Sequence, residues 1–463
     1  MAVDLGRQID RAAHSAELDR LLQNLQGNIL KGHGRDHTIH LFLKLRPDTL
    51  PEAKAWIRAF AGQHVTSAEK QFEEMDDFRR FKIIGGLFAN FFLTSKGYEV
   101  LGVPAPADLK FVAGMKASGA ALGDPPPAEW EEGYRGEIHA SILLAHDDES
   151  ELNRAARHFL QEVRGFADVV AGERGKAMRN KNCEAVEHFG YVDGRSQPLF
   201  LKEDIDKEHE KEPGTVLYDP SAPADLVLVP DPNGDGDMSF GSYFVFRKLE
   251  QNVLGFKKAE EQLADELGLK GPDEEIAGVM VVGRFEDGTP VVLQKTDGRT
   301  DPVPNNFNYT ADPDGLRCPF HGHIRKVNPR GDTAKFGVPE EQERRHRIAR
   351  RGITYGERCK EPKDNPTMED LPSKDVGLLF MCFQSNIENQ FEFIQGQWAN
   401  NEGFLLPGTG IDPVIGQRQN PVEQRWPAVW GRSVKRPFSF QGFVTLKGGE
   451  YFFAPSISAL KKI

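Results

Sequence analysis

The chain has 463 residues, 39% of them hydrophobic, which suits two or three domains, or one large fold of two similar halves, and argues against wholesale disorder. The formal net charge of -12 would repel phosphate backbones and tolerate cations, so nucleic acid is not an expected partner. The sequence shows neither the apolar segment of a secretory signal nor an apolar run of the ~20 residues that span a membrane, which predicts a cytoplasmic protein without a membrane partner. The cysteines show no paired spacing, which predicts free, mostly buried thiols.

The first half of the chain alternates between strand-like and helix-like patterns. Apolar residues that recur at every second position indicate strands, and helical spacing with acidic residues in the first turn indicates helices. A stretch rich in Pro, Gly and Ala indicates a loop. In chain order, we expect a helix over 15–30 that ends near Gly27, a strand over 37–45, a helix over 51–62, a surface loop over 102–127, a strand over 138–148 and a helix over 149–166.

The second half repeats this strand-then-helix rhythm, although no residue-level repeat is visible. We expect a strand over 241–249, a helix over 250–268, a strand over 376–384 and a helix over 387–398. The polar segment 202–214, a run of Glu, Lys and Asp, is interpreted as a solvated linker between the halves.

The first segment that can carry chemistry surrounds Asp193. Gly190 and Gly194 bracket this residue, and Pro198 ends the segment. Because glycine permits positive φ, the chain can turn sharply here and present one carboxylate from a loop. The same pattern also suits an ordinary Asp-Gly turn in which the carboxylate binds its own backbone.

The second segment carries two histidines, His321 and His323. Pro319 suits the first position of a helix and Pro329 prevents its continuation, which predicts a helix of about three turns. At positions i and i+2 the two side chains point to different sides, so at most one should face a given ligand. Zinc is disfavoured because no second ligand pair follows Cys318 at the usual spacing. A buried structural histidine and a proximal haem ligand both remain open.

The third segment is rich in arginine. Five arginines lie within the eight residues from Arg344 to Arg351. Charge alone favours a solvated face over an anion-binding patch. Ile348 and Ile353 flank Arg350 and Arg351, so at least one guanidinium is expected to point inward, near apolar surface.

Together and in this order, the three segments resemble the dye-decolorizing peroxidases. Gly190 to Gly194 match the GxxDG motif of that family, Cys318 to Arg330 match its CPFxxHIRKxNPR helix, and Ile348 to Gly356 match its IxRxGIxYG segment. Thr354 stands where many relatives have Pro, and Gly352 where some have an active-site Asn. The length is more similar to that of the larger bacterial members. Further stretches that resemble the family are 25–35, 241–249, 281–290, 377–395, 412–416 and 448–456.

The resemblance implies an α+β fold of two ferredoxin-like halves, with antiparallel sheets and peripheral helices. The N-terminal half, 1–214, would carry the GxxDG aspartate, and the C-terminal half, 215–463, the proximal histidine and the distal arginine. Haem b would lie mainly in the C-terminal half. The implied activity is a haem peroxidase that reduces hydrogen peroxide and oxidises dyes, phenolic or other organic donors through a ferryl intermediate; some larger bacterial relatives also oxidise Mn(II).

The resemblance also implies roles for single residues. His323 would ligate the iron, and Asp412 would accept a hydrogen bond from its other ring nitrogen, unless Asp412 is only a turn or cap residue before Pro413. Asp193 would move a proton on peroxide, and Arg350 would keep that carboxylate charged and stabilise the departing oxygen. Three further residues would contact the haem: Arg330 would pair with a propionate, and Leu378 and Phe380 would line the distal pocket. The alternatives are a surface arginine for Arg330 and ordinary strand core for Leu378 and Phe380.

Other expectations concern donors and assembly. Trp398 and Tyr355 are candidates for a surface relay to bulky dyes, although a structural aromatic is the more common role of such residues. Oxidation of Mn(II) would need a carboxylate cluster that cannot be chosen among 70 acidic residues. Neither homo-oligomerisation nor packaging in a protein cage can be recognised from the sequence. The alternative functions are a non-catalytic haem carrier or sensor, against which Asp193 and Arg350 argue, and an iron-free α+β binding protein.

Overall fold

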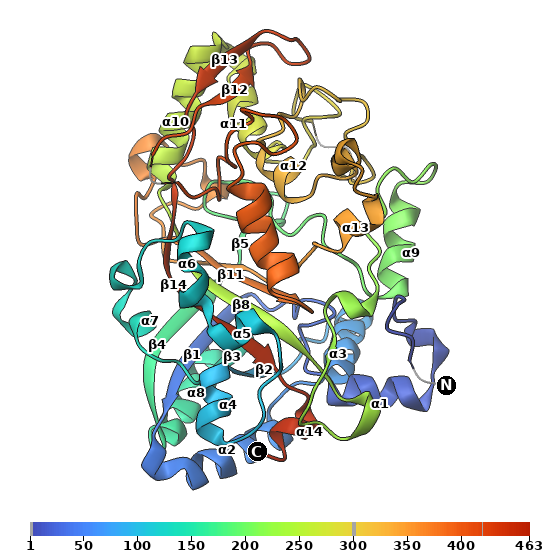
Figure 1. Cartoon of the computed structure of the whole chain (residues 1–463), viewed down its shortest axis with the longest axis vertical. Helices are drawn as coiled ribbons and strands as arrows, with labels where there is room; N and C mark the ends of the chain where they lie inside the picture. Colours follow the sequence, from blue (N-terminus) through green and yellow to red (C-terminus); the bar gives the residue numbers. More distant parts are fainter. Residues whose placement is uncertain (1–2, 299–301, 419) are drawn as a thin grey trace.

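An antiparallel sheet runs through the computed structural model, which describes residues 3–298, 302–418 and 420–463 (Figure 1). Two short hairpins pair outside this sheet: β5 (Met178–Arg179) with β6 (Ala185–Val186), and β12 (Gln424–Pro427) with β13 (Lys435–Phe438). The strands of the large sheet are β1 (His37–Leu45), β2 (Phe88–Leu93), β3 (Ala140–His146), β4 (Ala167–Lys176), β7 (Val229–Pro230), β8 (Phe240–Gln251), β9 (Ala349–Arg350), β10 (Ile353–Tyr355), β11 (Gly377–Gln384) and β14 (Val444–Ala454).

The helices lie around this sheet, and several begin at side-chain caps. Ser15 caps α1, and Asp148 caps α8 by accepting hydrogen bonds from two backbone N–H groups. The helices are α1 (Ala16–Asn24), α2 (Leu50–Gln63), α3 (Ala68–Phe81), α4 (Ser95–Leu101), α5 (Leu109–Ala113), α6 (Met115–Leu122), α7 (Glu132–Arg135), α8 (Glu149–Val163), α9 (Lys202–Lys211), α10 (Val253–Leu267), α11 (Glu275–Val282), α12 (His323–Val327), α13 (Glu340–Arg344) and α14 (Ile457–Leu460), with π-helical turns η10 (Glu388–Glu392) and η11 (Ile394–Ala399).

The order of the strands repeats. In each half, the four principal strands lie in the order second, third, first and fourth along the chain: β2-β3-β1-β4 in one half and β10-β11-β8-β14 in the other. A helix follows the first and the third strand of each set, which is the β-α-β-β-α-β pattern of a ferredoxin-like unit. The predicted α+β fold with two ferredoxin-like halves is therefore confirmed, whereas its boundary at 214/215 stays a prediction.

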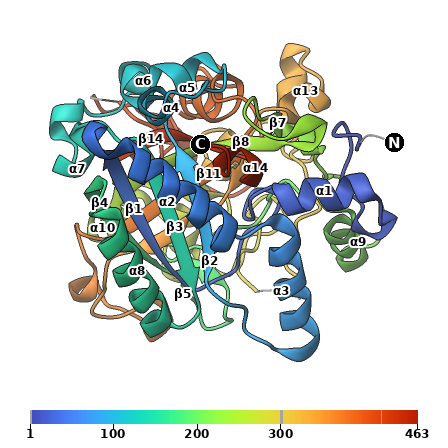
Figure 2. The same cartoon turned by 90° about the horizontal axis from the view of Figure 1, so that it is seen from below.

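The two halves share one core. Their sheets join where β14 meets β2, with Phe453 opposite Leu93. Close to this joint, Phe92 stacks on Phe244 with ring centroids 4.4 Å apart. Figure 2 shows α2 and α8 lying over the strands of the N-terminal half, while Figure 1 places α10, α11 and the β12–β13 hairpin at the end of the molecule opposite α14.

Most predicted elements have structural counterparts, with two clear corrections. The prediction of a surface loop over 102–127 is wrong, because α5 and α6 form within this segment despite its Gly and Ala content. Segment 202–214 is not an irregular linker, because α9 forms over most of it with Ile205 buried. The first helix ends at Asn24 instead of near Gly27, because Leu25 adopts an extended backbone.

The remaining expectations of this kind concern membranes and cysteines. Within the described residues, no helix combines the length and the apolarity that crossing a membrane requires. All four thiols are free, as predicted, but only Cys318 and Cys382 are buried, while Cys183 and Cys359 are exposed.

Candidate active site

A cavity of about 240 Å³ lies against the open face of β8 and β11. Its wall combines apolar side chains with an unusual number of arginines. Six of the seven predicted site residues line it: Asp193, His323, Arg330, Arg350, Leu378 and Phe380. The seventh, Asp412, lies behind His323, so residues far apart in the sequence meet at one place.

The strand period explains one wall of this cavity. Leu378 and Phe380 lie two residues apart on β11, so both side chains point to the same face of the sheet. Their partners in the register with β8 are Leu249 and Arg247, which also line the cavity. Leu379, between the two, is fully buried on the opposite face.

His323 is held by a buried carboxylate. Its Nδ1 lies 2.9 Å from Oδ2 of Asp412, whose side chain is fully buried. A carboxylate only accepts hydrogen bonds, so Nδ1 carries a proton, and in the neutral ring Nε2 then has the free lone pair that ligates a metal. The other oxygen of Asp412 accepts from the N–H groups of Val414 and Ile415, at 2.8 and 3.0 Å. Asp412 is therefore a turn residue and the partner of His323 at once.

The helix that carries His323 is shorter than predicted. α12 begins at His323 and covers five residues, whereas Pro319 belongs to a preceding turn in which its carbonyl accepts from the N–H of Gly322. Gly322 lies so close to α11 that an added Cβ would stand 3.0 Å from the carbonyl oxygen of Met280. His321 is not on the helix; its ring packs edge-on against Trp426, away from the cavity.

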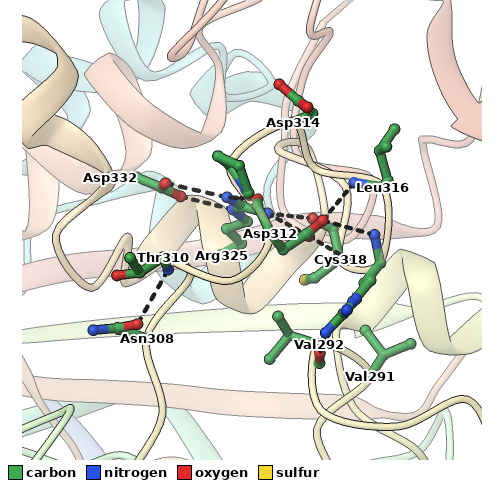
Figure 3. Close-up of polar contacts among 12 residues, drawn as sticks. Val291, Val292, Asn308, Thr310, Asp312, Asp314, Leu316, Cys318, Arg325 and Asp332 are labelled. Atoms are coloured by element: carbon green, nitrogen blue, oxygen red, sulfur yellow. Dashed lines mark hydrogen bonds and ion pairs between the residues drawn. The ribbon is translucent and has the colours of Figure 1, made fainter. Parts of the chain in front are cut away.

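A buried ionic cluster around Arg325 holds α12 in place, and the sequence analysis did not predict it. The guanidinium of Arg325 binds the carboxylates of Asp312 and Asp332 at 2.9 and 2.7 Å (Figure 3). Asp312 also accepts from the backbone N–H groups of Leu316 and Cys318, which ties the segment before α12 to the helix. Arg325 stood in the motif, but nothing in the sequence identified its partners.

Asp193 and Arg350 form a direct pair at the cavity. Nη1 of Arg350 lies 2.8 Å from Oδ1 of Asp193, and both side chains are about one-third exposed or less. Gly190 and Gly194 adopt φ values of 102° and 86°, as the loop geometry requires. The N–H of Gly194 also donates to Oδ1, so the Asp-Gly turn exists as well. Oδ2 accepts no hydrogen bond from the described part of the chain and is available to a ligand.

Of the other arginines in this segment, three more are buried or partly buried, and one of these, Arg344, pairs with Asp219. Arg347 lines the cavity, and Arg351 donates to backbone carbonyls of Asn28 and Ile29. Arg345 is exposed and pairs with Asp225. The interpretation of this segment as a solvated face is therefore wrong, and the expectation of an inward guanidinium is confirmed.

Three cavity-lining arginines have no ion pair with a carboxylate in the described ranges: Arg284, Arg330 and Arg347. Arg330 donates instead to the carbonyls of Asn305 and Phe307, at 2.7 and 2.6 Å. Burial, reinforced by the charge of Arg330, lowers the pKa of Arg284 to about 9. Excess positive charge of this kind suits a ligand with carboxylate groups of its own.

These features fit the haem implied by the sequence. A free imidazole nitrogen, apolar walls and unpaired arginines match an iron, a porphyrin ring and its propionates respectively. In the residues that the structure describes, no three His, Cys, Asp or Glu side chains are grouped to hold a metal ion, which argues against the zinc interpretation and identifies no Mn(II) site.

Glu187 lies at the cavity beside the GxxDG loop and was not predicted. Its carboxylate accepts from the N–H groups of Phe189 and Tyr191, and from the amide of Gln251. Burial raises the pKa of Glu187 to about 7, and the nearby charge of Asp193 adds to this effect. Its position three residues before Gly190 was the only signal in the sequence.

This raised pKa predicts a dependence of stability on pH. A carboxyl group whose pKa is higher in the folded state stabilises the fold when protonated, fully below about pH 4.5 and no longer above about pH 7. The effect amounts to at most about 3 kcal/mol across that window. Glu187→Gln mimics the protonated form. As the pH rises from about 4.5 to about 7, the melting temperature of this variant should therefore fall less than that of the wild type. If the melting temperatures of the two proteins change in parallel with pH, the assignment of the raised pKa to Glu187 is contradicted.

The two aromatic residues proposed for a surface relay are not on the surface. Tyr355 is 8% exposed and Trp398 is 6% exposed. The Lys248 ammonium covers the ring of Tyr355, and Trp398 packs edge-on against Phe393 and His346. Neither residue therefore presents more than a small part of its surface to a bulky dye.

Comparisons with known proteins match nearly the whole chain. A family model described as the DyP dimeric alpha+beta barrel domain matches residues 24–178, and one described as Dyp-type peroxidase, C-terminal, matches residues 280–405. The chain is 46% identical to the multifunctional dye peroxidase DyP2 of Amycolatopsis sp., over 100% of both chains. It is 30% identical to the dye-decolorizing peroxidase msp1 of Mycetinis scorodonius, over 99% of this chain and 90% of the relative.

Solved structures agree with these matches. The structure of DyP2 from Amycolatopsis sp. superposes with a TM-score of 0.95 at 44% identity, covering 100% of both chains. The DyP-type peroxidase AnaPX of Anabaena sp. superposes with a TM-score of 0.92 at 45% identity, covering 99% of this chain and 98% of the relative.

Proposed function

The chain belongs to the family of dye-decolorizing peroxidases, and on this basis we propose that His323 binds the haem iron while Asp193 and Arg350 activate hydrogen peroxide. The protein is a haem peroxidase that reduces peroxide and oxidises dyes and related organic donors. The observation that carries the assignment of residues is the 2.8 Å Asp193–Arg350 pair, which lines the same cavity as His323.

Haem, when bound, supplies the electrons that reduce peroxide and recovers them from donors. His323 would hold the haem, and Asp412 would position its imidazole. The hydrogen bond from Nδ1 to Asp412 fixes the orientation of the imidazole and makes its Nε2 a stronger base. Arg330 and Arg347 are the candidates for binding the propionates.

At the same cavity, Asp193 would move a proton. Hydrogen peroxide must lose a proton from one oxygen and gain it on the other before the O–O bond breaks. The free Oδ2 of Asp193 accepts the first proton and returns it to the departing oxygen. Arg350 holds Asp193 through Oδ1 and stabilises negative charge on that departing oxygen.

The alternative of an iron-free binding protein is excluded by membership of a family of haem enzymes. A haem carrier or sensor would need neither the carboxylate of Asp193 nor the guanidinium of Arg350 at its cavity, so their pairing there supports catalysis. The direct test is the absorbance spectrum of the purified haem protein before and after one equivalent of hydrogen peroxide. The Soret band should change, and a phenol or dye should restore it. A band that does not respond to peroxide would contradict the proposal.

Trp398 remains a candidate for an internal relay. It packs in the same apolar cluster as Ile394, which lines the cavity. Trp398→Phe is expected to lower the turnover of bulky anthraquinone dyes while sparing small phenols, which can approach the cavity itself. Steady-state rates with both donors check this, and Tyr355→Phe is the control. Equal loss with both donors would mean that Trp398 only supports the fold.

Finer points of this function stay predictions. They are the oxidation of Mn(II), the cytoplasmic location, homo-oligomerisation and packaging in a protein cage. The acidic net charge of -12 favours the attraction of Mn(II) but identifies no binding site.

A further inference from the structure

The end of α3 carries an apolar stripe past the body of the protein. Phe72, Met75 and Phe78 follow one another at helical spacing, so their side chains lie along one side of the helix. Phe72 is buried and Met75 packs against the core, but Phe78, one turn further on, is exposed. Figure 2 shows α3 at the edge of the molecule. The stripe that holds this helix on the core therefore continues where the described chain offers nothing to cover it.

The residues that follow extend this exposed surface. Phe81 is the last residue of α3, and Lys82 ends the helix in the left-handed region, with a φ of 58°. Ile83 and Ile84 come directly after it. Phe78, Phe81, Ile83 and Ile84 together form an apolar ridge whose members are between 46% and 66% exposed. Contiguous apolar surface of this kind marks interaction sites in soluble proteins.

Cations are interspersed with the apolar ridge. Arg79, Arg80 and Lys82 lie between its members in the sequence, and all three are exposed. Arg79 pairs with Asp76 at 3.4 Å, whereas Arg80 and Lys82 form no ion pair within residues 3–298, 302–418 and 420–463. The ridge is thus locally basic in a chain whose formal net charge is -12. This combination favours a partner surface that is both apolar and acidic.

An acidic hollow adjoins the ridge. Its volume is about 870 Å³, and Ile84 forms part of its wall. The rest of the wall comes from the end of β3 and the first turn of α8. Arg35 joins the two parts, because its guanidinium binds Glu74 of α3 at 2.6 Å and Asp147 at 3.5 Å. The acidic residues that line the hollow are Asp147, Asp148, Glu149 and Glu151.

Two of these four carboxylates are neutralised within the chain. Asp147 binds Arg35, and Glu151 binds Arg154 at 2.9 Å. Asp148 and Glu149 form no ion pair in the part of the chain that the structure describes. Two unpaired cations therefore lie on one side of Ile84 and two unpaired carboxylates on the other.

We propose that the apolar ridge and the acidic hollow form the interface of a dimer of this chain. A two-fold interface brings the same surface of both copies together. A two-fold axis near Ile84 places Arg80 and Lys82 of each copy opposite the acidic hollow of the other, with the apolar ridges in contact between them. The apolar contact supplies the affinity, and the four charged contacts fix the orientation.

The observations favour a second copy over a membrane. Anionic lipids would attract Arg80 and Lys82, but the same approach would bring the unpaired carboxylates beside Ile84 against the lipid headgroups. A second copy satisfies both charges at once. None of the residues of the ridge or the hollow lines the haem cavity, so the inference does not depend on the assignment of the catalytic residues.

The first test is the mass of the haem enzyme at micromolar concentration, measured by light scattering after size-exclusion chromatography. The wild type should have twice the 51.7 kDa mass of the chain. Phe81→Glu combined with Ile84→Glu places two charges in the apolar contact and should give a monomer. Leu109→Glu is the matched control, because Leu109 is equally exposed and lies on α5, far from α3 in Figure 2. This control should remain a dimer.

A charge swap tests the proposed orientation. Arg80→Glu and Glu149→Arg should each weaken the dimer about tenfold or more, because each places like charges opposite one another. The double variant restores opposite charges and should recover most of the affinity. Circular dichroism and the Soret band should be unchanged in all variants. Added salt should also weaken the wild-type dimer, since exposed charges are screened.

Three results count against the inference. One is a wild type that stays monomeric, and another is a dimer that persists in Phe81→Glu with Ile84→Glu. The third is a charge swap that recovers no affinity. A monomer that binds vesicles of phosphatidylcholine and phosphatidylserine would assign the apolar ridge to a membrane surface instead, and the proposed dimer would then be wrong.

Discussion

His323→Ala is expected to lose most of its haem, and with it most of the normal Soret band of the purified protein. The imidazole is the only iron ligand proposed from the chain, and its Nε2 is prepared for binding by the fully buried carboxylate of Asp412. The apolar walls and the unpaired arginines would remain, so weak, non-specific haem binding can persist without the normal spectrum. Asp412→Asn should be milder and reduce the affinity ~10- to 100-fold, because the imidazole remains but loses its anionic partner.

His321→Ala is the matched control for this experiment. His321 lies two residues away in the same motif, but its ring packs against Trp426 and does not reach the cavity. This variant should lose some stability and keep its haem. Haem titration followed by absorbance, together with circular dichroism, distinguishes the two effects. Normal haem occupancy in His323→Ala, or its loss in His321→Ala alone, would reverse the assignment.

Asp193→Asn and Arg350→Leu are both expected to slow the reaction with peroxide strongly, and pH distinguishes them. Loss of a general acid–base group typically costs ~10²- to 10⁴-fold, and loss of one electrostatic donor ~10²- to 10³-fold. A carboxylate must be ionised to accept a proton, so the wild-type rate should fall at the acid end of the profile. That acid limb should vanish in Asp193→Asn and persist, at a lower rate, in Arg350→Leu.

Stopped-flow absorbance after mixing with peroxide measures these rates across pH. Glu187→Gln is a useful companion, because it changes a second carboxyl at the cavity without changing the Asp193–Arg350 pair. It should retain the acid limb. Wild-type rates in both Asp193→Asn and Arg350→Leu would remove this pair from the mechanism, and an acid limb that disappears only in Glu187→Gln would transfer the proton-moving role to Glu187.

The sequence predicted regular elements best where polar and apolar residues alternate, even though β1 is buried along most of both faces. Residues 37–45 alternate in polarity, and β1 has these same bounds. Composition was a poorer guide: the Gly, Ala and Pro content of 102–127 indicated a loop, but short helices can form there because Asp108 caps α5 and Met115 packs in the core. Likewise, the two prolines around His323 suggested a longer helix than the five residues of α12.

The candidate site was predictable from motifs and not from contacts. All seven predicted residues line the cavity or bind one that does, because each motif preserves local geometry around its key side chain. The supporting residues were not predictable, because their roles depend on partners distant in sequence. Glu187 acts through Gln251, and Arg325 through Asp312 and Asp332, and no spacing rule connects these positions.

The position of β14 has a consequence for synthesis. It is the last strand of the sheet to leave the ribosome, yet it lies between β8 and β2 and is the element that joins the two strand sets. Until residues 444–454 emerge, the nascent chain holds two separate half-sheets, each with an unpaired edge that can pair with another chain. The haem cavity lies against β8 and includes Val444 of β14, so it is completed only then. We therefore expect haem to enter a complete cavity only after residues 444–454 have been synthesised, and chaperones that shield β-edges to limit the yield of active enzyme when it is overproduced.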